Sequence, residues 1–185
     1  TRVLDNGIVI SHIKSNFPGI FRMELIIRAG ALDEKKDELG FAHLIEHLMS
    51  FFPSNKYRDS VTNQNVINSK SISLNAWTEP NTVGYFMSGL DKYSLFITTM
   101  MLENYLNPVL DKKIFEQEKN AVAAELSSII NSSNYPMDQV IDFVRFRDTN
   151  LSYTILDEKE NVMKNATLDN IMSFRNRLYR PEYTN

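Results

Sequence analysis

The sequence predicts an α+β domain in which a mostly antiparallel or mixed β-sheet packs against several α-helices. Two observations carry this prediction: strand patterns come first, and helical patterns lie between and after them. That order favours an α+β fold over a doubly wound parallel sheet. No internal repeat, low-complexity tract or linker divides the 185 residues, which suffice for one sizeable core. We therefore expect a single domain over residues 1–185.

The strands are predicted from alternating or short apolar runs beside turn residues. Strict alternation over 21–30 predicts a half-buried strand, whose inner face carries Phe21, Met23, Leu25 and Ile27. Asp5-Asn6-Gly7 is a turn signal between two short apolar runs at the start of the chain. Residues 72–78 and 82–88 are typical of two further strands, joined by a turn at 79–81.

Helical periodicity accounts for most of the remaining chain. Beyond the polar loop 30–40, we expect helices at 41–50, 61–69, 91–106, 112–130, 137–147 and 168–179, the last capped by Thr167. The apolar residues of helix 91–106 are Leu95, Phe96, Leu102, Tyr105 and Leu106. Those of helix 112–130 form a stripe of Ile114, Phe115, Val122, Leu126 and Ile129.

Composition excludes several classes of function. The net charge is -3 with both signs interspersed, so we expect neither a nucleic-acid partner nor a membrane surface. No apolar run is long enough to span a bilayer. Cysteine is absent, so any metal must be held by histidine and carboxylate side chains. We expect an intracellular, in the first place cytoplasmic, protein, with a mitochondrial or other organellar location as the alternative.

The segment FAHLIEHLMS, residues 41–50, carries the chemistry. His43 and His47 are four residues apart, so on a helix both imidazoles project from one face and can reach one metal ion. Glu46 shares that face, where its carboxylate can accept a proton from water at the metal. A catalytic zinc takes three protein ligands and keeps a position for water, so a third ligand is required.

The third ligand is expected on helix 112–130. His12 is a poor candidate because it lies in a strand-like segment far from the motif. Glu118 and Glu125 are seven residues apart, on one helix face and beside apolar positions. An acid on an apolar face is costly unless it is paired or bound to metal. Glu116 lies off this face, where we expect it to be exposed to solvent.

The motif and its context resemble the pitrilysin (M16) family of zinc peptidases, whose inverted motif is His-x-x-Glu-His. The resemblance extends over SLNAWTEPNTVGYF, the block NPVLDKKIFEQEKNAVAAEL and the terminal RLYRPEYTN. It implies an M16 N-terminal catalytic domain with Zn²⁺ on His43, His47 and Glu125, and with Glu46 as general base. It further implies that Glu118 hydrogen-bonds a ligand histidine, and that Asn75 and Ala76 pair with extended peptide substrate.

Further expectations follow from the resemblance. IFEQEKNAVAAEL and GALDEK look closer to the insulin-degrading enzyme and pitrilysin branch than to the mitochondrial processing peptidase. The family forms a chamber from homologous domains, so we expect such a partner domain, on this polypeptide or another. The chain begins without Met in a strand-like stretch and stops at YRPEYTN as an extended segment starts, so we also expect it to be truncated at both ends. Two segments depart from the family pattern: FFPSN replaces a Gly-Thr after the catalytic helix, and NSKSIS replaces a Gly-rich turn.

Three hypotheses remain open at this point. The first is a zinc metalloendopeptidase that cleaves extended or unfolded peptides. The second is a catalytically silent scaffold or binding subunit of an M16-type complex. The third is a helical domain with chance histidines, since His-x-x-Glu-His arises by chance in about one in a few hundred such chains. The third predicts that Glu125 lies far from His43 and His47.

Overall fold

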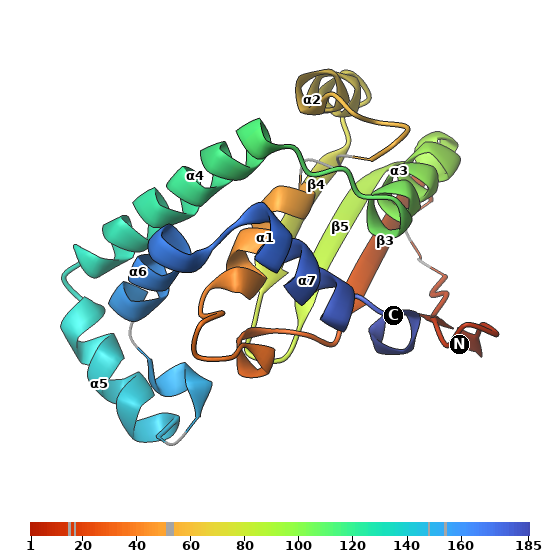
Figure 1. Cartoon of the computed structure of the whole chain (residues 1–185). Coiled ribbons are helices and arrows are strands. Elements are labelled where there is room, and N and C mark those ends of the chain that lie inside the picture. Colours follow the sequence, from red (N-terminus) through yellow and green to blue (C-terminus); the bar gives the residue numbers. More distant parts are fainter. Residues whose placement is uncertain (15, 17, 51–53, 148, 154) are drawn as a thin grey trace.

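The computed structural model describes residues 1–185 apart from 15, 17, 51–53, 148 and 154. Its strands are β1 (Arg2–Val3), β2 (Val9–Ile10), β3 (Ile20–Ile27), β4 (Ser73–Thr78) and β5 (Val83–Leu90). Its α-helices are α1 (Phe41–Ser50), α2 (Ser60–Ser69), α3 (Ser94–Leu106), α4 (Lys112–Ile130), α5 (Tyr135–Arg145), α6 (Ile155–Asn165) and α7 (Leu168–Leu178). This architecture confirms the predicted α+β class (Figure 1).

The main sheet has the antiparallel order β3-β5-β4, with β4 at one edge. Successive side chains of each strand point to opposite faces of the sheet, and the helices cover the face that carries the apolar side chains. The inner face, which includes Leu25, Ile27, Tyr85 and Met87, is buried in the common core. The opposite face carries Arg22, whose guanidinium carbon lies 3.6 Å from the centre of the Phe86 ring. The predicted burial of one face of β3 is therefore confirmed.

Helix α1 lies at the centre of the helical layer. It packs against β4 and β5 on one side and contacts α4 and α7 on the other (Figure 1). Its apolar residues are almost completely buried: Phe41, Ala42, Leu44, Ile45, Leu48 and Met49. Helix α6 runs alongside α4. The fold thus places α1 beneath α4 and α6, with its polar face turned toward them.

The two ends of the chain meet beside β3. The predicted turn at 5–7 is confirmed, because β1 and β2 pair and Gly7 has the positive φ of 94° that such a turn uses. The C-terminal segment forms a short 3₁₀ helix, Pro181–Tyr183, and then continues along the edge of β3. Ile26 and Asn185 exchange two backbone hydrogen bonds there, and Val9 donates to Thr184.

The structure corrects several details of the predicted helices. A helix at 155–165 was not predicted, yet α6 is there. The predicted helix 91–106 begins with a 3₁₀ turn at Asp91–Tyr93. In α3 the buried residues include Ile97, Met100 and Met101, whereas Leu95 and Leu106 are exposed. Ile129 is also exposed, although we placed it on the apolar stripe. Thr167 caps α7 as predicted, accepting from the backbone N–H of Asn170.

Candidate metal centre

The loop before α1 is fixed by polar contacts that define where the helix begins. Gly40 precedes the helix with a φ of 83°, a conformation that favours glycine. The buried Glu34 carboxylate accepts the backbone N–H groups of Gly40 and Ala42, at 3.0 and 2.8 Å. Burial raises the pKa of Glu34 to about 8, against the lowering effect of these two hydrogen bonds. The N-terminal end of α1 is therefore held by a buried acid, which accepts hydrogen bonds from backbone N–H groups that have no partner within the helix.

His43, His47 and Glu125 come together on the polar face of α1. Glu125 Oε2 lies 3.8 Å from His43 Nε2 and 3.4 Å from His47 Nε2. The two imidazole rings are 5.0 Å apart, centre to centre, at an interplanar angle of 72°. One ligand atom from each residue lies within 4.8 Å of the other two. The chance hypothesis predicted a distant Glu125 and is contradicted by these distances.

The donor set fits Zn²⁺ in both chemistry and spacing. Two imidazole nitrogens and one carboxylate oxygen are ligands of the type found at catalytic zinc sites. Tetrahedral zinc with bonds of about 2.0–2.1 Å keeps neighbouring ligand atoms about 3.3–3.4 Å apart. The two Nε2–Oε2 separations, 3.4 and 3.8 Å, are close to that spacing. Side-chain exposures of 18%, 22% and 50% for His43, His47 and Glu125 leave the site open to solvent.

The other ring nitrogen of each histidine faces a further carboxylate. His47 Nδ1 lies 3.3 Å from Glu118 Oε2, a residue singled out from the sequence. His43 Nδ1 lies 3.2 Å from Glu158 Oε1, a residue that sequence reasoning missed. Burial lowers the pKa of His43, but the hydrogen bond to Glu158 and the nearby carboxylates outweigh it and leave this pKa raised. The centre is thus rich in acidic groups.

Glu46 lies on the same face of α1, one residue before His47. Its Oε2 accepts a hydrogen bond of 3.1 Å from the hydroxyl of Thr78, the last residue of β4. This hydrogen bond joins the Glu46 carboxylate to the end of β4. Glu46 is half-buried, as are both histidines. The motif residues therefore form a single polar stripe on an otherwise buried helix.

Asn75 and Ala76 lie in the middle of β4. Their β5 partners are Phe86 and Tyr85, and no strand among the described residues pairs with the other edge of β4. The side-chain amide oxygen of Asn75 accepts the backbone N–H of Ala76 at 2.9 Å. Thr78 ends the same strand and donates to Glu46, so the C-terminal end of β4 lies beside the helix that carries the motif.

The remaining sequence candidates lie elsewhere. His12 is exposed and lies outside the short strand β2, so the strand-like assignment of this residue was wrong. Within the described residues, the one His/Asp/Glu group with metal-ligand spacing is the one above, and it does not include His12. Glu116 is exposed, as predicted.

The two segments that depart from the family pattern differ in what the structure describes. The first three residues of FFPSN, 51–53, lie outside the described residues. In NSKSIS, Ser71 adopts a φ of 52° just before β4. This left-handed conformation is one that glycine adopts more readily, and a Gly-rich turn is what the resemblance leads one to expect here.

Comparison with known proteins decides the family. The sequence profile described as "Insulinase (Peptidase family M16)" matches residues 14–159, well over half of the chain. The chain belongs to the M16 peptidase family. The match includes both histidines of the motif, Glu118 and Glu125, and it extends to Glu158 in the first turn of α6.

Individual relatives lie in the predicted branch. Protease 3 of Escherichia coli strain K12 is 28% identical over 137 residues, which are 74% of this chain and 14% of the relative. An insulin-degrading enzyme homolog of Dictyostelium discoideum is 21% identical over 184 residues, 95% of this chain and 18% of the relative. The chain therefore spans less than a fifth of the length of either relative.

Solved structures share the fold. The crystal structure of pitrilysin superposes with a TM-score of 0.81 at 23% identity, over 98% of this chain and 20% of that one. A protease from Helicobacter pylori gives a TM-score of 0.82 at 21% identity, over 99% of this chain and 44% of that one. The M16-like fold predicted from the resemblance is confirmed. None of the helices in the described ranges is long and apolar enough to cross a membrane.

Proposed function

We propose that this M16 chain provides the zinc centre of a metalloendopeptidase that hydrolyses extended or unfolded peptides. Membership in the family supports a peptidase. The zinc-dependent mechanism rests on one observation: His43, His47 and Glu125 bring three ligand atoms within 4.8 Å of one another, with Glu46 on the same helix face.

The proposed roles of the side chains follow from their positions. When bound, zinc lowers the pKa of a water molecule and polarises the scissile carbonyl. His43, His47 and Glu125 hold the ion. Glu46 takes a proton from the attacking water and passes it to the leaving amine. Thr78 donates to one oxygen of Glu46, which keeps that carboxylate in place and leaves its other oxygen for the proton.

The substrate is proposed to bind as an added strand along the free edge of β4. An extended peptide gains main-chain hydrogen bonds at a sheet edge, with little dependence on its side chains. At Ala76 the substrate must compete with the Asn75 amide oxygen for the backbone N–H. Broad specificity for unfolded peptides is the expected result.

A homologous M16 domain, on the same chain or on a partner subunit, is proposed to complete the substrate chamber. The relatives are at least five times longer than the segment that matches this chain. Isolated residues 1–185 are therefore expected to bind zinc with weak or no turnover. The silent-subunit hypothesis remains the alternative, and complete retention of His43, Glu46, His47, Glu118 and Glu125 argues against it.

The test compares Glu46→Gln with wild type in the full-length protein, with zinc content and peptide cleavage measured on the same samples. Loss of a general base is expected to lower kcat by about 10²- to 10⁴-fold. Zinc content is expected to stay unchanged, because Glu46 is not a proposed ligand. The exposed Glu116→Gln serves as a control. Equal cleavage by Glu46→Gln and wild type would eliminate the proposed mechanism, and a wild type without zinc or cleavage would favour the silent subunit.

A further inference from the structure

Helix α6 contacts the metal centre through a residue with no assigned role. Glu158 Oε1 lies 3.2 Å from His43 Nδ1, and its side chain is 26% exposed. On the other side of the centre, Glu118 Oε2 lies 3.3 Å from His47 Nδ1. The two contacts have similar nitrogen–oxygen distances, but they come from different helices, α6 and α4.

An ionised carboxylate only accepts hydrogen bonds, so a histidine that bonds to it through Nδ1 must carry its proton there. The neutral imidazole then has its lone pair on Nε2. In His43 this is the nitrogen that faces Glu125 Oε2, at 3.8 Å. The Glu158 contact therefore selects the tautomer that can bind a metal at the position where the three ligand atoms converge.

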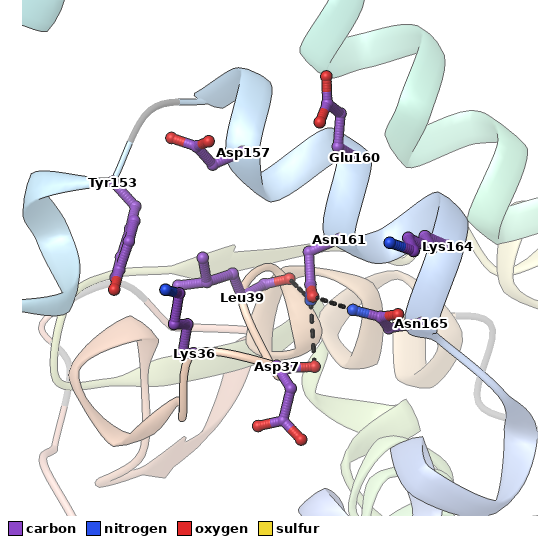
Figure 2. A pocket seen from close by; sticks show the side chains of 9 residues that line it. All are labelled: Lys36, Asp37, Leu39, Tyr153, Asp157, Glu160, Asn161, Lys164 and Asn165. Atoms are coloured by element: carbon purple, nitrogen blue, oxygen red, sulfur yellow. Dashed lines mark hydrogen bonds between the residues drawn. The ribbon is translucent and has the colours of Figure 1, made fainter.

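A side chain of α6 anchors this helix to the loop before α1. Asn161 donates to the carbonyl oxygens of Leu39 and Asp37, at 2.7 and 3.3 Å, and Asn165 donates to Asn161 Oδ1 at 2.6 Å. Figure 2 shows Asn161 directed from α6 toward this loop. Asn161 is one of the residues that line an open pocket of about 550 Å³. Val162, the next residue, is fully buried.

The close approach of α6 depends on Gly40. A Cβ at this position would lie 2.6 Å from both Glu158 Cγ and Val162 Cγ2, so only glycine lets the helix come this near to α1. Lys119 of α4 donates to the carbonyl of Ala166, just after the end of α6, at 3.0 Å. Glu158 is thus carried by a helix fixed on two sides, rather than by a mobile surface segment.

We propose that Glu158 is a positioning residue that orients His43 for metal binding, as the α6 counterpart of Glu118. The inference rests on the proposed zinc site. Partners that hold the free nitrogen of a ligand histidine typically contribute 10- to 100-fold to metal affinity.

The experiment measures zinc affinity by competition with a chromophoric chelator, in the full-length protein. Glu158→Ala is expected to weaken zinc binding by about 10- to 100-fold. Glu158→Gln is expected to weaken it less, because the amide oxygen can still accept from Nδ1. Glu160→Ala and Glu160→Gln are the matched controls, since Glu160 is exposed on the same helix and its loss removes the same charge. Affinities that are equal for the Glu158 and Glu160 variants would overturn the proposal.

A second readout is independent of zinc. Nitrogen-15 NMR of the metal-free protein at alkaline pH reports which nitrogen of the neutral His43 carries the proton. The Nδ1–H form is expected to dominate in wild type and in Glu160→Ala, and to lose its dominance in Glu158→Ala. An unchanged tautomer in Glu158→Ala would contradict the proposal. If wild type binds no zinc, the proposed function fails, while the tautomer still reports on Glu158.

Discussion

The two histidines of α1 share one helix face but depend on different parts of the chain. His47 contacts Glu118 and Glu125, both on α4 and seven residues apart. His43 contacts Glu125 as well, but its other partner is Glu158 on α6. Helical spacing places Glu118 and Glu125 on one face of α4, and the family resemblance implies that they meet the histidines. No pattern in the sequence indicates that α6 comes onto α1 at His43. The two histidines thus have similar carboxylate contacts, but only the contact of His47 could be expected from the sequence.

The largest effect is expected from removing the histidines themselves. If both hold the same ion, His43→Ala and His47→Ala should each leave two protein ligands and weaken zinc binding by more than the roughly 10- to 100-fold expected for a lost hydrogen-bond partner. The exposed His12→Ala is the control and should bind zinc like wild type. Competition with a chelator measures the zinc affinity of all three variants. If either His43→Ala or His47→Ala still binds zinc tightly, the two histidines do not contribute equally to the site.

The second prediction concerns Glu34, at the His43 end of α1. Its pKa is raised from 4.5 to about 8 by burial, so between these values the folded protein holds a proton that the unfolded chain has released. The unfolding free energy should therefore fall as pH rises through this window. Glu34→Gln removes the titration. In metal-free protein, the stability of the variant relative to wild type should rise by up to about 1.4 kcal/mol per pH unit.

Urea unfolding at a series of pH values measures this difference. Its total is expected to reach a few kcal/mol, because the shift of the Glu34 pKa covers several pH units. Wild-type and variant stabilities that change in parallel across the window would contradict the assignment of this pKa to Glu34.

The third prediction isolates the packing of α6 on α1. Gly40→Ala should lower the unfolding free energy by about 2–3 kcal/mol, from a left-handed backbone and from crowding against Glu158 and Val162. Gly19→Ala is the matched control: its φ of 82° is similar, but an added Cβ would meet nothing within 4 Å. It should cost only about 1–2 kcal/mol. Equal losses in the two variants would mean that α6 does not depend on Gly40.

The smallest effect is expected from Glu118, and its size tests whether the carboxylate partners of His47 and His43 contribute equally to zinc binding. Glu118→Ala should weaken zinc binding by about 10- to 100-fold, or about 1.4–2.8 kcal/mol, similar to the effect proposed for Glu158→Ala. Glu116→Ala, an exposed acid two residues away on α4, is the control. If Glu118→Ala weakens zinc binding strongly and Glu158→Ala does not, then only His47 depends on a carboxylate partner for metal binding.

Most of the fold could be predicted because the buried elements have clear periodicity. The strand pattern of 21–30 and the apolar positions of 112–130 are of this kind. Helix α6 was missed although its apolar residues fit one helix face: in ILDEKENVMKN they form two pairs that lie seven residues apart, or two helical turns. Five consecutive polar residues separate the pairs, so the segment is typical of a polar loop. The helix is held by buried Val162 and by polar contacts of Asn161 to a distant loop.

The candidate site divides in the same way. His43, Glu46, His47 and Glu125 were singled out from spacing, charge and resemblance, and the fold brings them together. Glu158 carried no signal, since an acid in a charged segment is most simply explained as a solvated surface residue. Only the contact with His43, 115 residues away along the chain, distinguishes it. Local patterns report helix faces, but they do not report which helices meet.

The most direct test of the zinc centre is anomalous diffraction at the zinc absorption edge, from crystals of the zinc-loaded protein. One strong peak is predicted about 2.0–2.2 Å from His43 Nε2, His47 Nε2 and a carboxylate oxygen of Glu125. The Nδ1 atoms of the two histidines should face Glu158 and Glu118. Absence of a peak at this position, or a zinc ion bound through either Nδ1 or without Glu125, would contradict the proposed centre.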